Sequence, residues 1–258
     1  MTRTIGLRRC AAVLCCGLVL AAAATRRVIA AGCSFESQGE GRVAAILDNR
    51  TFRLEDGREV RLAGIQTVAA GATALAELIA GRDVTLRGDS DEPDRWGRQP
   101  ALVFAQGSDT SIQSLLLAKG DALVSADIAD KGCAAELAAA EAAARQAKRG
   151  TWRDWVVIKN AESPGDILTR IGQFAVVEGK VLSVRQAGAT FYVNFGRRWT
   201  QDFAATISKR MMTSLEAMGI NLRFLEGRRV RVRGFVEQRG GPRIELLRVG
   251  QLEVVGGN

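Results

Sequence analysis

Three strands, a helix and two further strands follow one another twice along this chain of 258 residues. In the first half, apolar stretches separated by polar turns predict strands at 43–47, 51–54, 59–65, 83–87 and 101–105, with a helix at 70–80. In the second half, the same pattern predicts strands at 174–184, 190–195, 202–207, 229–237 and 243–255, with a helix at 209–225. This order is typical of an OB-fold barrel, so the chain is expected to contain two barrels of related topology.

The first half carries more helix than the second. Residues 110–119 and 133–149 have helical composition, and a glycine follows each of them. The predicted fold is therefore mainly β with helices (α+β): a barrel with three helices over residues 33–158, then a five-stranded OB-like barrel over 166–258. Residues 159–165 contain a proline and small polar residues, which predicts a linker.

The N-terminus has the pattern of a secretory signal peptide, expected to span residues 1–32. Arginines precede an apolar run at 10–24, and no acidic residue occurs before Glu36. The alternative is a membrane anchor, but a spanning helix needs about 20 apolar residues, and Thr25-Arg26-Arg27 interrupts the run. The mature protein is expected to be periplasmic or secreted, without a membrane span. The cleavage site stays open, and lipid attachment at Cys33 is a minor alternative.

Two cysteines, Cys33 and Cys133, remain after removal of the leader. An even pair in an oxidising compartment favours a disulfide, the alternative being two separate thiols. The sequence contains no histidine, which excludes histidine-based acid–base catalysis and histidine-ligated metal sites.

Charge is distributed unevenly. The leader carries five arginines and no acid, residues 33–158 hold 15 Lys and Arg against 19 Asp and Glu, and residues 159–258 hold 16 against 9. An anionic partner is therefore expected to meet the C-terminal part of the chain.

Four motifs occur in the first half in a fixed order. They are ILDNRTFRL at 46–54, RLAGIQT at 61–67, DRWGR at 94–98, and a helix with Glu141 and Arg145 that ends in Gly150-Thr151-Trp152. Together they resemble the staphylococcal nuclease (thermonuclease) family, whose signatures are Asp-Gly-Asp-Thr after a strand, Arg-Leu-x-Gly-Ile-Asp-Thr/Ala-Pro-Glu, Asp-x-Tyr-Gly-Arg and a closing Gly-x-Trp. The resemblance covers residues 42–152 and implies the barrel with three helices.

The resemblance also implies what has been lost. The family holds calcium through two aspartates whose positions here are Arg50 and Gln66, and its water-activating glutamate falls at Val68 or Ala69. Asp48 and Thr67 remain as a residual polar site, with Asp48 expected to pair with Arg50. Since a hard divalent cation needs several oxygen ligands, neither calcium nor another metal cofactor is expected to bind.

The two phosphate-binding arginines of the family are matched by Arg61 and Arg98. Guanidinium groups hold phosphate oxygens through paired hydrogen bonds, so these positions predict phosphate binding without hydrolysis. The alternative, salt bridges to Asp48, Asp94 or other acids of this domain, is left open.

The second half carries a surface pattern of its own. Arg229, Arg231 and Arg233 alternate with valines, which predicts an arginine face on one strand. The only tyrosine is expected on the face opposite its neighbouring phenylalanines, close to further basic and aromatic residues. The predicted nucleic-acid-binding residues are Tyr192, Arg197, Arg198, Trp199, Arg229, Arg231 and Arg233.

These observations predict an exported, catalytically degenerate thermonuclease-like protein that binds nucleic acid, more readily single-stranded, or another polyanion. One alternative is an active metal-dependent nuclease that recruits a metal through Asp48 and acids of the loop at 88–94. Another is a protein-interaction scaffold, in which the second-half arginines form only a solvated face.

Overall fold

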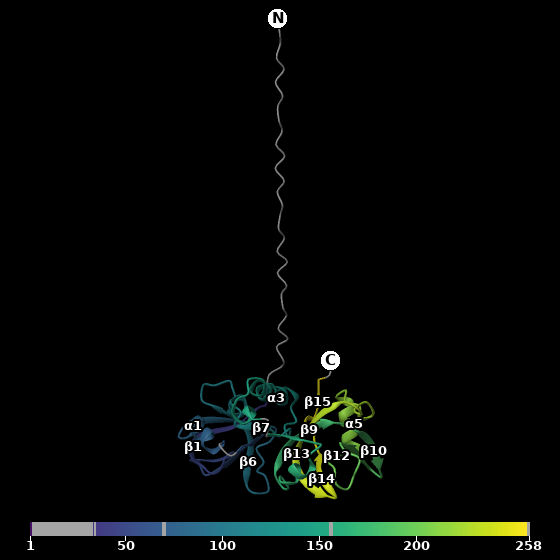
Figure 1. Ribbon diagram of the computed structural model, residues 1–258. Coiled ribbons are helices and arrows are strands. Elements are labelled where there is room, and N and C mark those ends of the chain that lie inside the picture. Colours follow the sequence, from purple (N-terminus) through teal and green to yellow (C-terminus); the bar gives the residue numbers. More distant parts are fainter. Residues whose placement is uncertain (2–32, 34, 69–70, 155–156, 257–258) are drawn as a thin grey trace. The chain divides into compact units, whose positions relative to one another are not determined.

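The computed structural model describes Met1, Cys33 and residues 35–68, 71–154 and 157–256 (Figure 1). Apart from Met1, the predicted signal peptide lies outside the described residues, as does Ala69. The chain divides into two units, residues 1–30 and 31–258, and every helix and strand discussed below belongs to the second unit.

Five strands of the first half close into a barrel in the order β1-β2-β3-β6-β5. They are β1 (Ser37–Ile46), β2 (Thr51–Leu54), β3 (Glu59–Leu62), β5 (Asp83–Arg87) and β6 (Arg98–Ala105). Neighbours pair antiparallel except β3 and β6, which are parallel. Strand alternation selects the core, because Phe52 and Leu54 of β2 are buried while Arg53 between them is exposed. The predicted barrel is confirmed.

Three helices accompany this barrel, as predicted. They are α1 (Gly71–Ile79), α2 (Ile112–Lys119) and α3 (Lys131–Gln146). A two-stranded sheet joins β4 (Ile65–Thr67), which precedes α1, to β7 (Ala122–Val124), which follows α2. The Ser111 hydroxyl caps α2 by accepting a hydrogen bond from the Ser114 N–H, and Gly120 ends the helix with φ at 82°.

Helix α3 begins at a cap that also orients the disulfide. The Asp130 carboxylate accepts the Cys133 N–H at 2.7 Å, and Cys133 is bonded to Cys33. The predicted disulfide is therefore confirmed, and it ties the N-terminal arm to the first turn of α3.

The strands of the second half pair in the order β10-β11-β12-β14-β13-β9-β8. They are β8 (Ile158–Asn160), β9 (Phe174–Lys180), β10 (Ser183–Ala187), β11 (Thr190–Asn194), β12 (Ala204–Ser208), β13 (Arg229–Arg239) and β14 (Gly241–Leu246). Helix α5 (Lys209–Ala217) follows β12, and β12 and β14 are the parallel pair.

Two differences from the expected strands are informative. The strand expected at 174–184 is interrupted at Val181 and Leu182, whose N–H groups bond to Arg228 and Asn194 on opposite neighbours. The two pieces, β9 and β10, thus lie toward opposite ends of the strand order, with β10 at one end and β8 following β9 at the other. The strand expected at 243–255 is β14, a 3-10 turn and β15 (Leu252–Val255), which pairs with β13.

The segment expected to be a linker is regular structure. Residues 159–165 hold the end of β8, which pairs parallel with β9, and the start of α4 (Pro164–Leu168). Lys159 is buried and donates to Asp166 at 3.0 Å. The domain boundaries placed around this segment remain a prediction.

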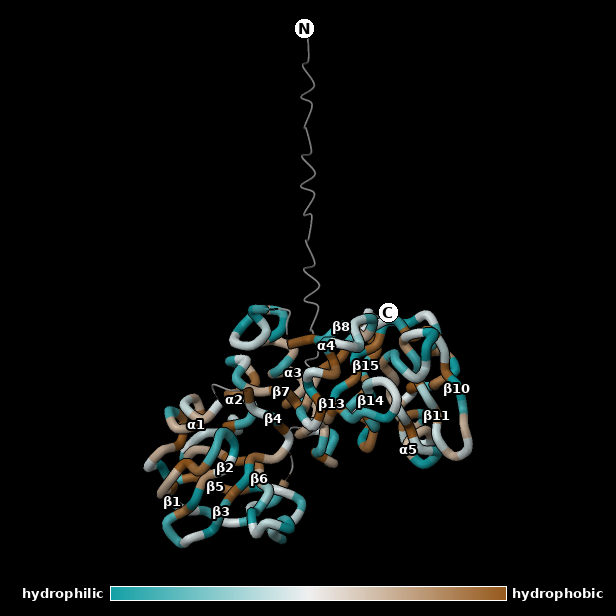
Figure 2. The backbone as a smooth tube through the Cα atoms, turned by 60° about the horizontal axis from the view of Figure 1, so that its bottom comes forward, coloured by the Kyte–Doolittle hydropathy of each residue, from teal (hydrophilic) through white to brown (hydrophobic). Residues whose placement is uncertain are grey.

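Each half has its own apolar core, and a smaller cluster joins them (Figure 2). In that cluster Leu123, Ala144 and Trp152 of the first half pack with Val176 of β9. Trp152 lies in η1 (Gly150–Arg153), the short helix that ends the last of the four motifs. Strand β9 is therefore covered by protein on both faces.

Candidate nucleic-acid interface

Three arginines of the first barrel lie close together, and two of them contact one carboxylate. Arg50 lies in the turn between β1 and β2, Arg61 lies on β3, and Arg98 begins β6. Strands β3 and β6 are parallel neighbours, and Arg61 lies opposite Pro100. Arg61 and Arg98 therefore lie on adjacent strands. The Leu62 N–H bonds to the Arg50 carbonyl at 2.8 Å, which holds the turn beside β3.

Asp94 is the carboxylate that this group shares. It accepts hydrogen bonds from Nε and Nη2 of Arg98 at 3.1 and 2.7 Å, and its Oδ2 lies 3.8 Å from Nη1 of Arg61. Burial works against the charge of Asp94, but the hydrogen bonds from the Arg98 side chain and backbone outweigh it, and the pKa of this carboxyl lies below its ordinary value. Asp94 is therefore ionised at neutral pH and forms a hydrogen-bonded ion pair with Arg98.

Arg50 has no carboxylate of its own in this group. Its guanidinium donates to the Gln66 side-chain oxygen at 2.7 Å. Burial, then the positive charge of Arg61, lowers the pKa of Arg50, and Asp48 offsets this only in part. Positive charges repel one another here, so an anion bound among them relieves that repulsion.

Asp48 does not form the expected side-chain ion pair with Arg50. Its Oδ1 accepts the backbone N–H of Arg50 at 2.8 Å, which shapes the turn. Thr67 lies at the end of β4, with its Cβ 2.8 Å from the place where a side chain on Gly71 would begin. The two members of the predicted residual polar site thus serve local backbone geometry and packing.

The Arg61 Nε is a buried donor that bonds to no acceptor among the described residues. Leaving such a group unsatisfied costs free energy, about 1–3 kcal/mol. A phosphate oxygen in this position supplies the acceptor and a negative charge together. The group of Arg50, Arg61 and Arg98 is called the arginine cluster below.

The arginine cluster does not fit a calcium ion. Calcium takes six to eight oxygen ligands, preferably charged ones, whereas Arg50 and Gln66 bond to each other where the family has aspartates. Across residues 35–68, 71–154 and 157–256, no group of three or more Asp, Glu, His or Cys side chains is placed to hold a metal ion.

Trp96 was not among the predicted site residues, although it lies beside the cluster. Its side chain is 59% exposed, and the guanidinium carbons of Arg95 and Arg98 lie 3.8 and 4.7 Å from its ring centroid. These cation–π contacts hold an exposed indole beside the cluster, where it adds aromatic surface next to the cations. The sequence signal was a lone aromatic residue in an otherwise polar loop.

The family model for staphylococcal nuclease homologues matches residues 60–154. The chain carries a staphylococcal nuclease homologue domain. No curated protein matches the chain. Arg61, Arg98 and Trp96 lie within the matched stretch of this nuclease-homologue domain, whereas Arg50 precedes it.

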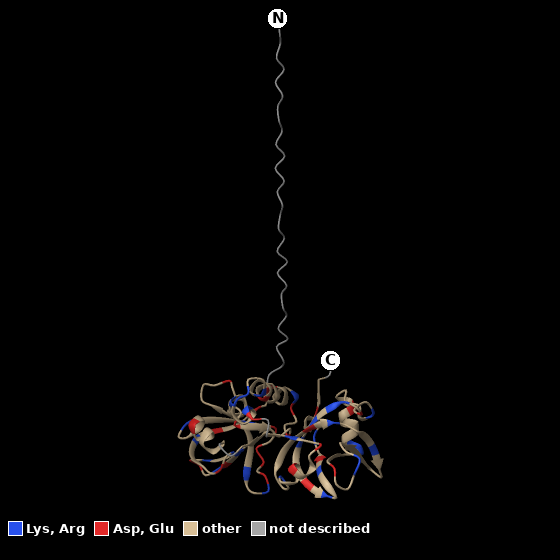
Figure 3. Cartoon of the chain, in the orientation of Figure 1, with Lys and Arg blue, Asp and Glu red and all other residues tan. Residues whose placement is uncertain are grey.

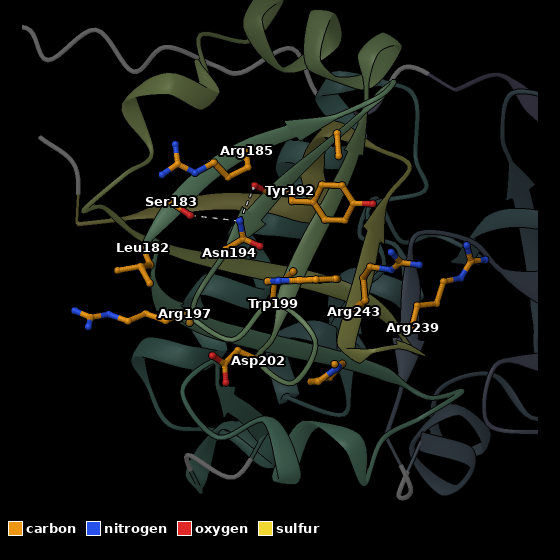
Figure 4. Close-up of a pocket in the computed structure, with 15 residues that line it drawn as sticks. Leu182, Ser183, Arg185, Tyr192, Asn194, Arg197, Trp199, Asp202, Arg239 and Arg243 are labelled. Atoms are coloured by element: carbon orange, nitrogen blue, oxygen red, sulfur yellow. Dashed lines mark hydrogen bonds between the residues drawn. The ribbon is translucent and has the colours of Figure 1, made fainter.

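Outside the nuclease-homologue domain, three of the predicted binding residues share a pocket of about 730 Å³ on the second barrel (Figure 4). These are Tyr192 on β11 and Arg197 and Trp199 in the loop after it. Arg198 is not in the lining, and its backbone N–H bonds to Asp202 at 2.7 Å. Phe195 is buried in the core, as expected for the face opposite Tyr192.

The expected arginine face on β13 is wrong for two of its three members. Arg229 is exposed, but Arg231 and Arg233 are only 5% and 4% exposed. Figure 3 marks Lys and Arg in blue and Asp and Glu in red along the chain. Periodicity correctly separates arginines from valines, yet the arginine side of β13 is covered by α3 near Arg233, and Glu253 of the neighbouring strand β15 also reaches this side.

Buried carboxylates neutralise these arginines. Arg233 forms a paired contact with Glu141 of α3, at 3.0 and 2.9 Å, and also donates to the Val124 carbonyl. Arg231 bonds to Glu178 at 2.6 Å and to Glu253 at 2.8 Å. Glu141, a residue of the family motif, therefore fastens the nuclease-homologue domain to the second barrel.

Proposed function

We propose that the protein is exported and binds nucleic acid, single strands in preference to duplexes, or another polyanion, without hydrolysing it. The observation that carries this proposal is the arginine cluster, in which Arg61 and Arg98 contact Asp94, Arg50 adds a third guanidinium group, and the Arg61 Nε lacks an acceptor among the described residues.

Phosphate is the anion whose chemistry suits this cluster. A guanidinium group offers two parallel N–H donors that match two oxygens of one phosphate. Arg61 and Arg98 lie on adjacent strands, and Arg50 adds charge from the turn. Because Asp94 already accepts from Nε and Nη2 of Arg98, a phosphate replaces Asp94 at that edge or binds to the remaining donors of the cluster. Trp96 lies where the base or sugar next to that phosphate would rest, which favours a nucleotide chain over an isolated phosphate ion.

Hydrolysis requires groups that these positions do not supply. Attack on a phosphodiester needs stabilisation of the developing charge and activation of water, by a metal or a general base. Arg50, Gln66 and Val68 stand at the ligand and base positions of the family, and Asp94 is bonded to Arg98. The cluster therefore holds a phosphate without a nucleophile to attack it.

Export is part of the proposal because two features agree with it. The sequence pattern at 1–32 is that of a signal peptide, and the Cys33–Cys133 disulfide is compatible with an oxidising compartment. Among the helices that the structure describes, none is long and apolar enough to cross a membrane.

The test is the affinity of purified mature protein for a fluorescent single-stranded oligonucleotide, measured by anisotropy. Arg61→Gln combined with Arg98→Gln is expected to weaken binding and to flatten the slope of log affinity against log salt by about 1.4, at roughly 0.7 per lost phosphate contact. Arg82→Gln, an exposed arginine outside the cluster, is the matched control. Equal salt slopes for the double variant and the control would refute the role of the cluster.

A further inference from the structure

The outer face of the second barrel carries a pocket that includes three of the residues predicted from the sequence, Tyr192, Arg197 and Trp199. The pairing of β10, β11, β12 and β14 aligns Ser183, Asn194, Ala204 and Arg243 in one row, and Arg185, Tyr192 and Thr206 in the next. Residues between these rows, such as Val193 and Ile244, point into the core. The rows therefore lie on the outer side of the sheet, and all of their members except Thr206 line the 730 Å³ pocket.

We propose that this pocket seats one unpaired nucleotide of a single strand, with its base against Trp199 and Tyr192 and its flanking phosphates on the arginines at either side. The inference rests on the proposed binding of nucleic acid and names where a base is held. A pocket of this volume lies within the range of about 300–1,000 Å³ that is usual for small-molecule sites.

Aromatic and apolar side chains supply the surface for a base. Trp199 is 78% exposed and Leu182 is 46% exposed, although both are large apolar residues. Exposed residues of this kind at one pocket mark a binding site more often than chance. An aromatic ring stacks on any base, and such stacking is sequence-tolerant.

Cations surround these aromatic residues, and most of them have no acidic partner. Within the described part of the chain, Arg185, Arg197 and Arg243 form no ion pair, and Arg239 has only a solvent-exposed contact with Glu237 at 3.6 Å. Asp202 is the one acid in the lining, and the Arg198 N–H occupies its Oδ2. The pocket therefore has an excess of positive charge.

One donor in the pocket is buried and unsatisfied. The Arg243 Nε bonds to no acceptor among the described residues, as the Arg61 Nε does in the arginine cluster. Glu245 lies two residues along the same face of β14 but is exposed, and it does not line the pocket. An incoming anion is thus the natural acceptor for Arg243.

The arrangement of the arginines selects a chain over a free nucleotide. Figure 4 shows Arg239 and Arg243 on one side of Tyr192 and Trp199, and Arg185 and Arg197 extending on the other side. An internal nucleotide has a phosphate before it and another after it. Cations on both sides of an aromatic centre match that pattern, whereas a mononucleotide uses one side only.

Duplexes and acidic polysaccharides fit less well. In a duplex the base faces are stacked on one another, so Trp199 cannot reach them. A polysaccharide with acidic groups would satisfy the arginines, but its puckered rings give less contact with the flat indole and phenol faces. Single-stranded nucleic acid is therefore the expected ligand of the pocket, and binding of an acidic polysaccharide is measured as the alternative.

The experiment compares a single-stranded oligonucleotide with one of equal length whose bases are absent, using the full mature chain. Trp199→Ala is expected to weaken binding of the normal oligonucleotide by about 5- to 150-fold. It should leave affinity for the abasic strand unchanged. Phe224→Ala, another exposed aromatic outside the pocket, is the matched control.

The charge contribution is measured separately. Arg243→Gln is expected to weaken binding of both oligonucleotides, while Arg210→Gln, an exposed arginine of α5, leaves both unchanged. Equal effects of Arg243→Gln and Arg210→Gln would overturn the proposal.

The remaining outcomes separate this inference from the proposed function. If the normal and abasic strands bind the wild-type protein equally, or Trp199→Ala behaves as Phe224→Ala does, the base pocket is refuted while polyanion binding stands. If heparin binds more tightly than the oligonucleotide and Trp199→Ala weakens it equally, the pocket takes an acidic polysaccharide and the proposal fails. If no single strand, duplex or heparin binds at low salt, the proposed function itself fails.

Discussion

The arginines of β13 and those of the pocket on the second barrel have the same side chain and opposite surroundings. Arg231 and Arg233 are buried against Glu141, Glu178 and Glu253. Arg185, Arg197 and Arg243 line an open pocket, and within the described residues none of them meets a carboxylate. The arginines that alternate regularly along β13 include the structural ones, whereas the arginines of the candidate binding surface are scattered along the sequence. Whether an arginine is structural or available for binding therefore depends more on the residues it contacts than on its spacing in the sequence.

The largest expected effect is on stability, at the buried pair of Glu141 and Arg233. Glu141→Gln leaves the Arg233 charge buried without its partner, which costs about 3–5 kcal/mol of unfolding free energy. Urea unfolding measures this cost. The combined change Glu141→Leu with Arg233→Met should restore much of the loss, because it removes both charges. A loss below about 1 kcal/mol for Glu141→Gln would show that this pair is not a structural one.

Glu178 is expected to give a smaller effect that depends on pH. Burial opposes its charge, but hydrogen bonds from Arg229 and Arg231 outweigh it and lower the pKa below the ordinary value of 4.5. The ionised carboxylate therefore stabilises the fold above about pH 4.5, and this contribution is lost as pH falls through the folded-state pKa. Glu178→Gln should cost about 1–3 kcal/mol at pH 7.

Unfolding measured from pH 7 to pH 3 tests this expectation. The stability gap between wild type and Glu178→Gln should narrow below pH 4.5. A gap that stays constant over that range would mean that Glu178 gains nothing from its two arginines.

The two groups of arginines should differ in their effect on binding. Arg197→Gln combined with Arg243→Gln should flatten the salt slope of single-strand binding by about 1.4, at roughly 0.7 per contact. Arg231→Gln should lower stability but leave that slope unchanged. If Arg231→Gln flattens the slope as much as the pocket variant does, the contrast between the two groups is wrong.

The smallest expected effect is that of calcium. A ligand that binds only the folded state raises stability by RT ln(1 + [L]/Kd). Because Arg50 and Gln66 occupy the positions of the family's aspartates, millimolar calcium should not shift the melting temperature measurably. A clear upward shift that Asp48→Ala abolishes would show that a metal site exists.

Much of the fold was predictable, because alternation and turn residues are local signals. The strands of the first barrel follow from these signals, and the Cys33–Cys133 pair follows from the two cysteines left after the leader. The interruption at Val181 and Leu182 did not follow, since apolar residues continue through the bend.

The candidate sites were predictable only in part. Alternation predicts which side of β13 carries the arginines. It does not predict that α3 covers that side, because this depends on contacts between segments far apart in the sequence. For the same reason Arg185, Arg239 and Arg243 were missed: they meet only after β10, β13 and β14 assemble. Arg50 was recognised as an obstacle to calcium, while its role as the third cation of the arginine cluster required the structure.

The most direct test of the central claim, binding without cleavage, is one titration read in two ways. A labelled single-stranded oligonucleotide is mixed with wild-type protein in calcium or in EDTA, and both its anisotropy and its length are recorded. We predict a saturable rise in anisotropy in both conditions, with the oligonucleotide recovered intact. Shortening of the oligonucleotide in calcium, absent in EDTA and abolished by Asp48→Ala, would contradict the account and show that the nuclease-homologue domain is an active enzyme.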